Sequence, residues 1–402
     1  MARTVSRFGS LLGALPYTAL FFLDASAAQM ATLAVASVLS GALSGLITGV
    51  WVDRLRRRPL MMAADAARAV ALLSVFGAAM TDRLTFPHLY LVALVTGVLD
   101  VLFDVAAVAY LPSVVPRRRL VEANSRLVAA DAVVESTAFG AGGLIVQVAS
   151  APIAVLVDAG TFAFSALSLS GVQAPEPVPA PRTQRIGLLR EAAEGARVVA
   201  RDPTLRAIGA SLVARDFAYG SIGAVILLFV ARDLDFPPAA MGAIFAVGGV
   251  ASFGGALLTR RLTGALGTRR AMVLGMAMTA VTATALPLTR GPMLVAAALL
   301  IAQQLGDGFA TVYEITQESV RQSLVPDRLL GRVDAAIRVA GLAATVIGAV
   351  AAGALGGPAG LRVPLALGAA AQALGAVALL TVPRPLVGRE DDGHDQRSRE
   401  PD

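Results

Sequence analysis

Long apolar stretches alternate with short, arginine-rich polar stretches along the whole chain. Most of the apolar stretches are about 17–25 residues long, which is enough for a helix to cross a lipid bilayer. We place twelve of them at residues 8–23, 30–52, 60–80, 88–111, 127–149, 153–172, 205–231, 239–258, 271–288, 293–313, 333–355 and 361–382. The pattern therefore predicts an all-α membrane protein with twelve transmembrane helices.

The composition agrees with a membrane chain and removes several classes of site. Of the 402 residues, 56% are hydrophobic and only 15% are charged, whereas soluble domains have about 25% charged residues. The chain has no cysteine and only two histidines, His88 and His394, so we expect no disulfide, no metal site and no histidine-based catalysis. Lysine is also absent, which excludes the phosphate-binding loop of ATPases. We expect neither an enzyme nor a bound cofactor.

The arginines are distributed unevenly between the two sides of the predicted helices. With the N-terminus placed inside, 26 of the 34 fall on the inner side and four on the outer side, at Arg83, Arg232, Arg290 and Arg362. Basic segments accumulate in the cytoplasm, so we expect a multi-pass protein of the cell membrane with both termini cytoplasmic. This topology also explains the net charge of +6 without a nucleic-acid partner.

A polar stretch divides the apolar segments into two groups of six. Residues 1–172 are predicted to form an N-terminal six-helix half, and residues 204–383 a C-terminal six-helix half. Between them, residues 173–203 read as a cytoplasmic linker that is rich in proline and ends in an amphipathic helix. Residues 384–402 are polar and charged, and we expect them to be a disordered cytoplasmic tail.

The two halves are related in sequence. V-V-P-R-R-R-L at residues 114–120 corresponds to L-V-P-D-R-L-L at residues 324–330, an offset of 210 residues. Such a repeat predicts two pseudo-symmetric six-helix bundles. The first apolar run is short for a membrane span, so we expect the first helix to be truncated or to begin upstream of Met1. A secretory signal peptide that ends in A-S-A-A at residues 25–28 is the alternative.

The loop after the second predicted helix carries the most specific motif in the chain. It reads G-V-W-V-D-R-L-R-R-R from Gly49 to Arg58. Asp53 can accept hydrogen bonds from arginines or from a helix N-terminus across this loop, which would latch a cytoplasmic gate. We assign the gate motif to Gly49, Asp53, Arg54, Arg57, Arg58, Asp65 and Arg68. The alternative is that the arginines act only as a topology signal.

This motif resembles the signature between helices 2 and 3 of the major facilitator superfamily, although Arg56 stands where that family usually has glycine. Other stretches are similar to its bacterial drug and siderophore exporters: F-D-V-A at 103–106, L-P-S-V-V-P at 111–116, E-A-N-S at 122–125, V-D-A-G-T-F at 157–162 and V-P-D-R-L-L-G-R-V at 325–333. The resemblance implies alternating access of two halves around a central site. In the drug:proton antiporter branch it also implies export driven by protons. Ala138 and Phe139 replace the Gly-Pro pair that such antiporters often carry.

Glycines concentrate on the second, fifth, eighth and eleventh predicted helices. Small residues at helical spacing let helix backbones approach closely in lipid. In the superfamily these four helices form the contacts between the halves. We therefore assign the half–half interface to Gly41, Gly45, Gly142, Gly143, Gly254, Gly255 and Gly348.

Charged residues inside predicted helices are candidates for transport chemistry, because charge inside a bilayer is costly. Asp104 lies near mid-depth of the fourth helix, and its counterpart at the offset of 210 is Glu314. A carboxyl group shielded from water can exchange protons near neutral pH, and its charged form attracts cations. The proton or substrate candidates are Asp104, Glu314, Glu135, Arg215, Asp216, Asp100 and Asp307. The alternative is structural pairing with a neighbouring arginine or a helix end, which is how we interpret Asp158.

Together these features predict a secondary transporter that exports a drug or secondary metabolite by alternating access, with the proton gradient as its energy source. The expected partners are a small-molecule substrate and the lipid bilayer, and we expect the chain to be a monomer. Two alternatives remain. One is a metabolite carrier without proton coupling, and the other is a membrane scaffold or sensor that has the fold but does not transport.

Overall fold

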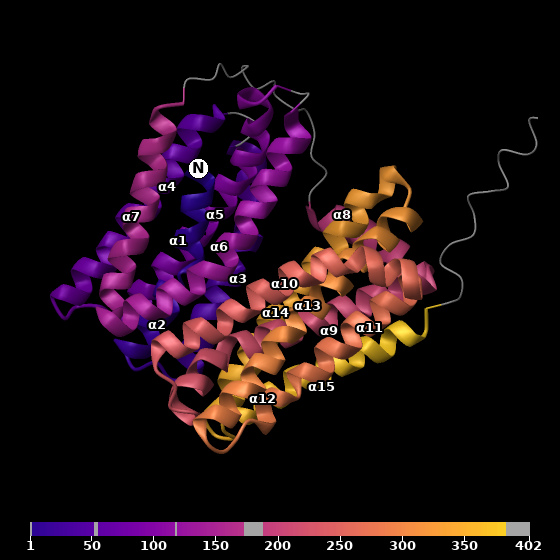
Figure 1. Ribbon diagram of the computed structural model, residues 1–402. Coiled ribbons are helices and arrows are strands. Elements are labelled where there is room, and N and C mark those ends of the chain that lie inside the picture. Colours follow the sequence, from indigo (N-terminus) through magenta and orange to yellow (C-terminus); the bar gives the residue numbers. More distant parts are fainter. Residues whose placement is uncertain (1, 52–54, 117–118, 173–187, 383–402) are drawn as a thin grey trace, which may run out of the picture.

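The computed structural model describes residues 2–51, 55–116, 119–172 and 188–382, and the regular structure within these ranges is helical. The helices are α1 (Ala2–Leu11), α2 (Ala14–Phe21), α3 (Ala27–Trp51), α4 (Arg57–Met80), α5 (Phe86–Val114), α6 (Leu120–Val148), α7 (Ala151–Ser170), α8 (Leu188–Arg201), α9 (Pro203–Leu228) with the π-helical turn η2 (Phe229–Asp233), α10 (Pro238–Leu266), α11 (Thr268–Ala283), α12 (Ala285–Leu288), α13 (Met293–Leu324), α14 (Asp327–Gly356) and α15 (Arg362–Leu380) (Figure 1). Ten described segments are long and apolar enough to cross a membrane. The α1–α2 pair and α3 complete a twelve-helix arrangement, so the predicted all-α fold class is confirmed.

Local sequence sets several helix ends. Asp202 caps α9, because its Oδ1 accepts hydrogen bonds from the backbone N–H groups of Thr204 and Leu205 at 2.8 and 2.9 Å. The first spanning segment is interrupted between α1 and α2 at Gly13, whose φ of 68° suits glycine and few other residues. The helix begins at Ala2, six residues before the apolar run starts. Its first turns are polar, so hydropathy alone did not detect them.

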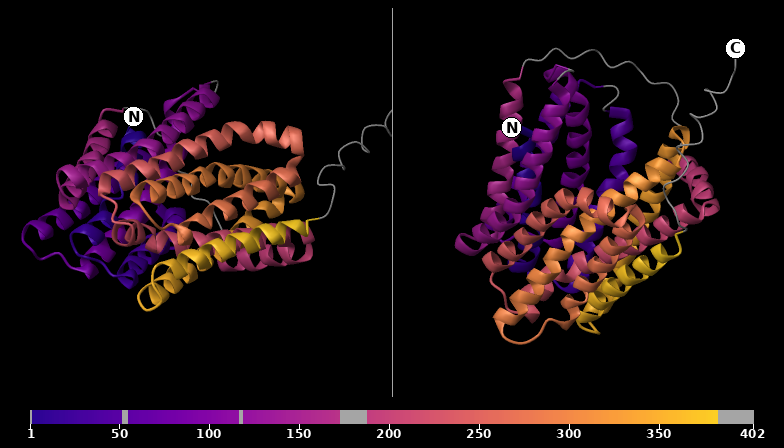
Figure 2. Two further views of the ribbon diagram at one scale, coloured as in Figure 1. Left: turned by 60° about the horizontal axis from the view of Figure 1, so that its bottom comes forward. Right: turned by 45° about the vertical axis from the view of Figure 1, so that its right-hand side comes forward.

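The twelve long segments form two bundles (Figures 1 and 2). Helices α1–α7 make the N-terminal half, and α9–α15 make the C-terminal half. We call the end of the molecule that carries Ala2 and α8 the α8 side, and the end that carries Phe21 and Ala149 the far side. Of the predicted linker 173–203, residues 188–201 form α8. Residues 173–187 of the linker and the predicted tail 384–402 lie outside the described residues.

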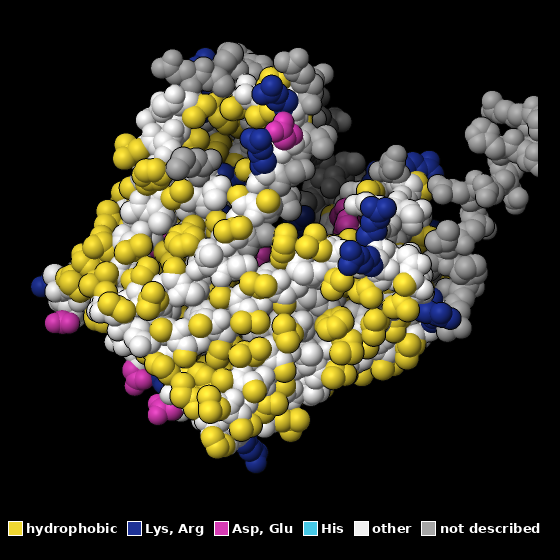
Figure 3. Space-filling model, in the orientation of Figure 1, with side chains coloured by type: hydrophobic (Ala, Val, Ile, Leu, Met, Phe, Trp, Pro, Cys, Tyr) yellow, Lys and Arg dark blue, Asp and Glu magenta, His cyan; other side chains and the backbone are white. Residues whose placement is uncertain are grey.

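The two halves contact each other mainly through α6 with α10 and through α3 with α14. Two polar contacts between the halves lie near the far side, one of them between α6 and α10. Gln147 Oε1 accepts a hydrogen bond from the backbone N–H of Ala239 at 2.9 Å, and Arg232 forms an ion pair with Asp24. On the α8 side the two bundles splay apart, and the surface between them is hollowed (Figures 1 and 3). The structure is therefore closed on the far side and open on the α8 side.

The interface glycines fit the prediction only in part. A Cβ added at Gly143 would lie 2.3 Å from the carbonyl oxygen of Pro238 on α10, so this glycine does face the other half. Gly142, Gly255 and Gly348 make equally close approaches, but within their own half: Gly142 to Leu12 between α1 and α2, Gly255 to α13 and Gly348 to α9. Their assignment to the half–half interface is wrong.

Two other assigned glycines, Gly41 and Gly254, do not approach the other half closely. An added Cβ at Gly41 or Gly254 would meet no atom within 4 Å, and the surroundings of Gly45 lie outside what the structure describes. The sequence shows which helices carry glycines at helical spacing, but the neighbour of each glycine depends on how its helix is rotated. Gly249, which approaches Ser136, and Gly353, which approaches Ala31, provide close contacts between the halves that we did not assign.

Helix α8 is amphipathic as predicted, but its apolar face covers protein. Val198 and Val199 pack in a cluster with Leu205, Val325 and Val333. Glu194 forms an ion pair of 3.0 Å with Arg332 on α14. Helix α8 therefore belongs structurally to the C-terminal half.

Candidate functional site

Helix α1 presents a polar stripe to the interior of the N-terminal half. Arg3, Ser6, Arg7 and Ser10 are three or four residues apart, so they lie on one face of the helix. In our reading of the sequence the helix began at Phe8, and Arg3 and Arg7 were treated as topology signals only. The regular spacing of these four residues is the signal that would have revealed the stripe.

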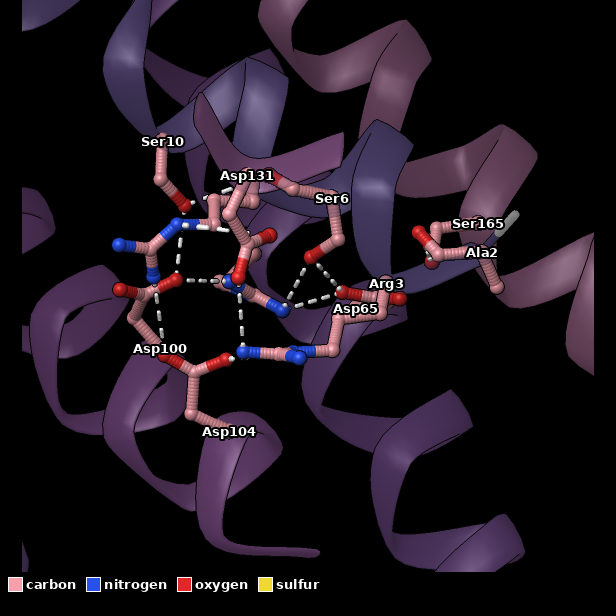
Figure 4. Close-up of polar contacts among 11 residues, drawn as sticks. Ala2, Arg3, Ser6, Ser10, Asp65, Asp100, Asp104, Asp131 and Ser165 are labelled. Carbon is pink, nitrogen blue, oxygen red and sulfur yellow. Dashed lines mark hydrogen bonds and ion pairs between the residues drawn. The ribbon is translucent and has the colours of Figure 1, made fainter. Parts of the chain in front are cut away.

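The two arginines of the stripe meet two carboxylates from different helices (Figure 4). Arg3 lies 3.7 Å from Asp104 on α5 and 3.2 Å from Asp131 on α6. Arg7 lies 3.5 Å from Asp104 and 3.8 Å from Asp131. The predicted proton candidate Asp104 therefore belongs to a four-residue ion-pair cluster, about one-third exposed, that ties α1 to α5 and α6.

Deeper in the same half, Arg68 of α4 is fully buried and its hydrogen bonds join α4 to α1 and α5. Its Nη1 donates to Asp100 on α5 at 2.6 Å, and its Nη2 donates to Ser6 on α1 at 2.9 Å and to Asp65 one turn away. Ser6 also donates to Asp65 at 3.1 Å, and Ser10 donates to Asp100 at 2.7 Å.

This network corrects the assignment of Asp65 and Arg68 to the gate loop. Both side chains are fully buried and point into the bundle, toward α1 and α5. Sequence distance suggested the loop because the two residues follow it closely. The rotation of α4 instead turns both of them away from the loop and into the protein interior.

Within the described part of the gate motif, Arg58 holds the end of α7. Its Nε donates to the carbonyl oxygen of Leu169 at 2.9 Å, where a helix has unpaired acceptors. Arg269 does the same for α15, with its Nε 2.8 Å from the carbonyl oxygen of Val382. Arg57 is half-buried at the start of α4, and Gly49 lies in α3. Asp53 and Arg54 lie outside the described residues, so the latch itself stays a prediction.

The C-terminal half contains a matching ion pair. Arg215 of α9 lies 2.6 Å from Glu314 of α13, and its Nη2 also donates to Asp216 at 2.8 Å. Arg215 and Asp216 are adjacent in the sequence, and the long arginine side chain folds back to reach its neighbour. The pair Arg7–Asp104 joins the first and fourth spanning segments of one half, and Arg215–Glu314 joins the corresponding segments of the other.

This second ion pair lines a cavity of about 590 Å³ between α9, α13 and α14. Arg321, on the same wall, is buried and forms an ion pair of 3.1 Å with Asp334. Arg338 also lines the cavity. The cavity is therefore a polar space with both signs of charge, and it is large enough for a small organic molecule.

Two further candidates lie where the halves meet. Glu135 on α6 is exposed, and it acts electrostatically on the half-buried Asp307 of α13 across the interface. Asp307 packs against Gly248, and an added Cβ there would lie 2.5 Å from its carboxylate. Tyr219 on α9 is within electrostatic range of both acids, and our reading of the sequence missed it. A single tyrosine in an apolar helix gives no signal that would have identified it.

Apolar helices of spanning length, paired in two bundles around charged and buried clusters, define a multi-pass membrane protein of the transporter-fold class. Residues 4–333 match the Major Facilitator Superfamily. The chain belongs to this family, and the superfamily resemblance noted in the sequence is confirmed.

Individual relatives agree with this assignment. An uncharacterized MFS-type transporter of Sinorhizobium fredii is 30% identical over 225 residues, which is 56% of this chain; the match spans only about half of that relative, 54% of its length. Among solved structures, a bacterial homologue of the iron transporter ferroportin in an inward-facing state is similar with a TM-score of 0.73 at 16% identity, covering 95% of this chain and 96% of that one. The nucleoside transporter NupG is similar with a TM-score of 0.68 at 14% identity, covering 95% and 98%. At these identities the structures share the fold.

Proposed function

We propose that this protein is a secondary active transporter that exports a small organic molecule, a drug or a secondary metabolite, by alternating access coupled to proton antiport. The observation that carries the proposal is the pair of equivalent ion pairs, Arg7–Asp104 and Arg215–Glu314, one in each half. Charged groups within membrane-spanning helices are costly and are usually retained for function. No bound cofactor is needed, because the proton gradient supplies the energy.

The arginine distribution supports a cytoplasmic α8 side with both termini inside the cell membrane. With that orientation, the structure is an inward-open state, in which a substrate enters the space between the halves from the cytoplasm. Rocking of the halves would close the α8 side and open the far side. The ion pairs next to the central space are the groups that a proton or a charged substrate meets first.

Proton flux in inverted membrane vesicles tests this proposal. Vesicles with an imposed pH gradient, followed by a pH-sensitive dye, receive lipophilic cations, macrolides or siderophores in turn. At least one compound is expected to collapse the gradient, and Asp104→Asn or Glu314→Gln should reduce this response. If the substitution removes about 1–3 kcal/mol of coupling free energy, the proton response should fall by roughly 5- to 150-fold.

Arg126→Gln is the matched control, because this arginine is 79% exposed and, among the described residues, its ion pair is with Glu122 on its own helix. It should leave the response unchanged. A flat response to the whole panel, with the protein shown to be inserted, would contradict proton-coupled export. A proton response that is identical in wild type and in both acid variants would remove these two acids from the mechanism.

A further inference from the structure

The buried Arg68 has more acidic neighbours than it can neutralise. Its guanidinium lies between two aromatic rings, 5.0 Å from the centroid of Phe103 and 4.3 Å from that of Phe162. Asp65 and Asp100 are bonded to it, and Asp158 of α7 is a third carboxyl group acted on by its charge. If all three acids were ionised, this interior site would hold two excess negative charges, which is energetically unfavourable in a low-dielectric environment.

Asp158 differs from the other two acids in its surroundings. Asp65 accepts hydrogen bonds from Arg68 and Ser6, and Asp100 accepts from Arg68 and Ser10 and is 40% exposed. Asp158 is only 6% exposed, and among the described residues its Oδ1 has no hydrogen-bond partner. A carboxylate without donors is the hardest of the three to keep charged in the interior.

Among the described residues, the charged groups that act on Asp158 are Arg68 and Asp100. A Cβ added at Gly9 of α1 would lie 2.5 Å from Asp158 Oδ1, so α1 covers the carboxyl group directly. Arg68 and Asp65 come from α4, and Asp100 from α5. Within the described parts of α2 and α6, which also pack on α7, no charged side chain acts on it. The hydroxyl of Thr161, on its own helix, donates to the backbone oxygen of Asp158 at 2.7 Å rather than to its carboxyl group.

Among the described residues, Arg68 has a hydrogen-bond donor that is not used. Its Nε is buried, and within the described structure it has no hydrogen-bond acceptor, while both terminal nitrogens are occupied. One donor and two acceptors thus remain unused among the described residues of this buried cluster, because Asp65 Oδ2 also has no hydrogen-bond partner. A movement that joined Arg68 Nε to Asp158 would satisfy both groups once the Asp158 carboxyl group carried a charge.

We propose that Asp158 is the proton-binding site of this chain. When the proton leaves, the Asp158 carboxylate pairs with Arg68. In the state described here Asp158 holds the proton as a neutral carboxylic acid, and Arg68 bonds Asp65 and Asp100. The Asp158 O–H bond breaks and the proton passes to water, which leaves a carboxylate that accepts a hydrogen bond from the Nε–H of Arg68; no other covalent bond of the protein changes. This inference rests on the proposed proton coupling and names the acid that performs it.

A cavity lies at the edge of the Arg68 cluster. Asp100, Ser6 and Ser10 line this cavity of about 210 Å³ together with Asp104, so water that entered it would reach two of the groups that contact Arg68, Asp100 and Ser6. Asp158 and α1 also touch each other at Gly9, close to the interruption of the first spanning segment at Gly13. A change of charge on Asp158 would therefore act directly on α1, the helix that carries the polar stripe.

Infrared difference spectroscopy of the full-length protein in lipid, recorded as the pH is raised, tests the proposal without any transported substrate. Aspartate labelled with ¹³C identifies bands that belong to aspartic acid. Wild type should show an aspartic carboxylic-acid carbonyl band that disappears at high pH and that remains in Asp307→Asn, since the half-buried Asp307 is a second aspartic acid within the helices. This band should be missing in Asp158→Asn and present in Asp131→Asn, the matched control, because Asp131 pairs with Arg3 and Arg7 outside the Arg68 cluster.

An unchanged band in Asp158→Asn, or no such band in wild type, would overturn the assignment. If Asp158→Asn does not fold, Asp158→Glu keeps an acid but should make the band insensitive to the aspartate label; persisting sensitivity would equally overturn it. The result is separate from the vesicle assay. A wild-type band with a flat proton flux refutes proton antiport alone, whereas antiport with the band intact in Asp158→Asn refutes the choice of Asp158 alone.

Discussion

Replacing Arg68 with methionine is expected to lower the free energy of unfolding by about 3–5 kcal/mol, since removing one partner of a buried ion pair leaves an uncompensated charge. Arg68 is fully buried, and it joins α4 to Asp100 on α5 and to Ser6 on α1. Methionine fills similar space but donates no hydrogen bond. Equilibrium unfolding of the purified protein in mixed detergent micelles measures the change.

The same substitution at Arg126 is the control for this experiment. Arg126 is 79% exposed, and its ion pair with Glu122 contributes about 0–1 kcal/mol at most, because exposed pairs are screened by solvent. Arg126→Met should therefore unfold close to wild type. Equal stability of Arg68→Met and Arg126→Met would show that the buried network does not hold the N-terminal half together.

Replacing Gly143 with alanine is expected to disfavour the state that is closed on the far side. The added Cβ would lie 2.3 Å from the carbonyl oxygen of Pro238 and 3.0 Å from Gly242, both of which are backbone atoms of α10 and cannot turn aside. Overpacking of this kind costs about 1–3 kcal/mol. That cost is enough to shift a two-state equilibrium by about fivefold to more than a hundredfold.

Spin labels placed on the far side measure this shift as a distance distribution. The chain has no cysteine, so cysteines introduced at Val148 of α6 and Asp233 of η2 would be the only labelled sites. Gly143→Ala should lengthen the distance between them and reduce flux in the vesicle assay, with normal insertion. Gly254→Ala is the control, because an added Cβ there meets no atom within 4 Å. An unchanged distance in Gly143→Ala would mean that the halves do not close through this contact.

The family assignment and the predicted function rest on different observations. Membership of the superfamily follows from the match over residues 4–333, and the sequence motifs had indicated it. The drug:proton antiporter branch stays a prediction, as do the substrate and the direction of transport. The substitution of Ala138 and Phe139 for the Gly-Pro pair is one place where the chain departs from that branch.

Hydropathy and charge along the chain determined the apolar segments, their division into halves and the repeat that relates Asp104 to Glu314. These properties are local or periodic, so they survive without knowledge of the packing. The structure places both acids against an arginine of the first helix of their own half, Arg7 and Arg215. This symmetry was detectable because both halves carry it at one offset.

The tertiary structure alone decided which polar groups meet. Arg3 and Asp131 are 128 residues apart, and their contact depends on the position and rotation of two helices. In the same way, the rotation of α4 turns Asp65 and Arg68 from the loop to the interior, and the rotation of α6 directs Gly142 to its own half. Helix periodicity states which residues share a face, but lipid and protein neighbours are both apolar for most of that face. Only the packing of the helices shows which positions face lipid and which face protein. Packing also places Asp158 within the influence of the Arg68 charge, while its Oδ1 has no hydrogen-bond donor among the described residues.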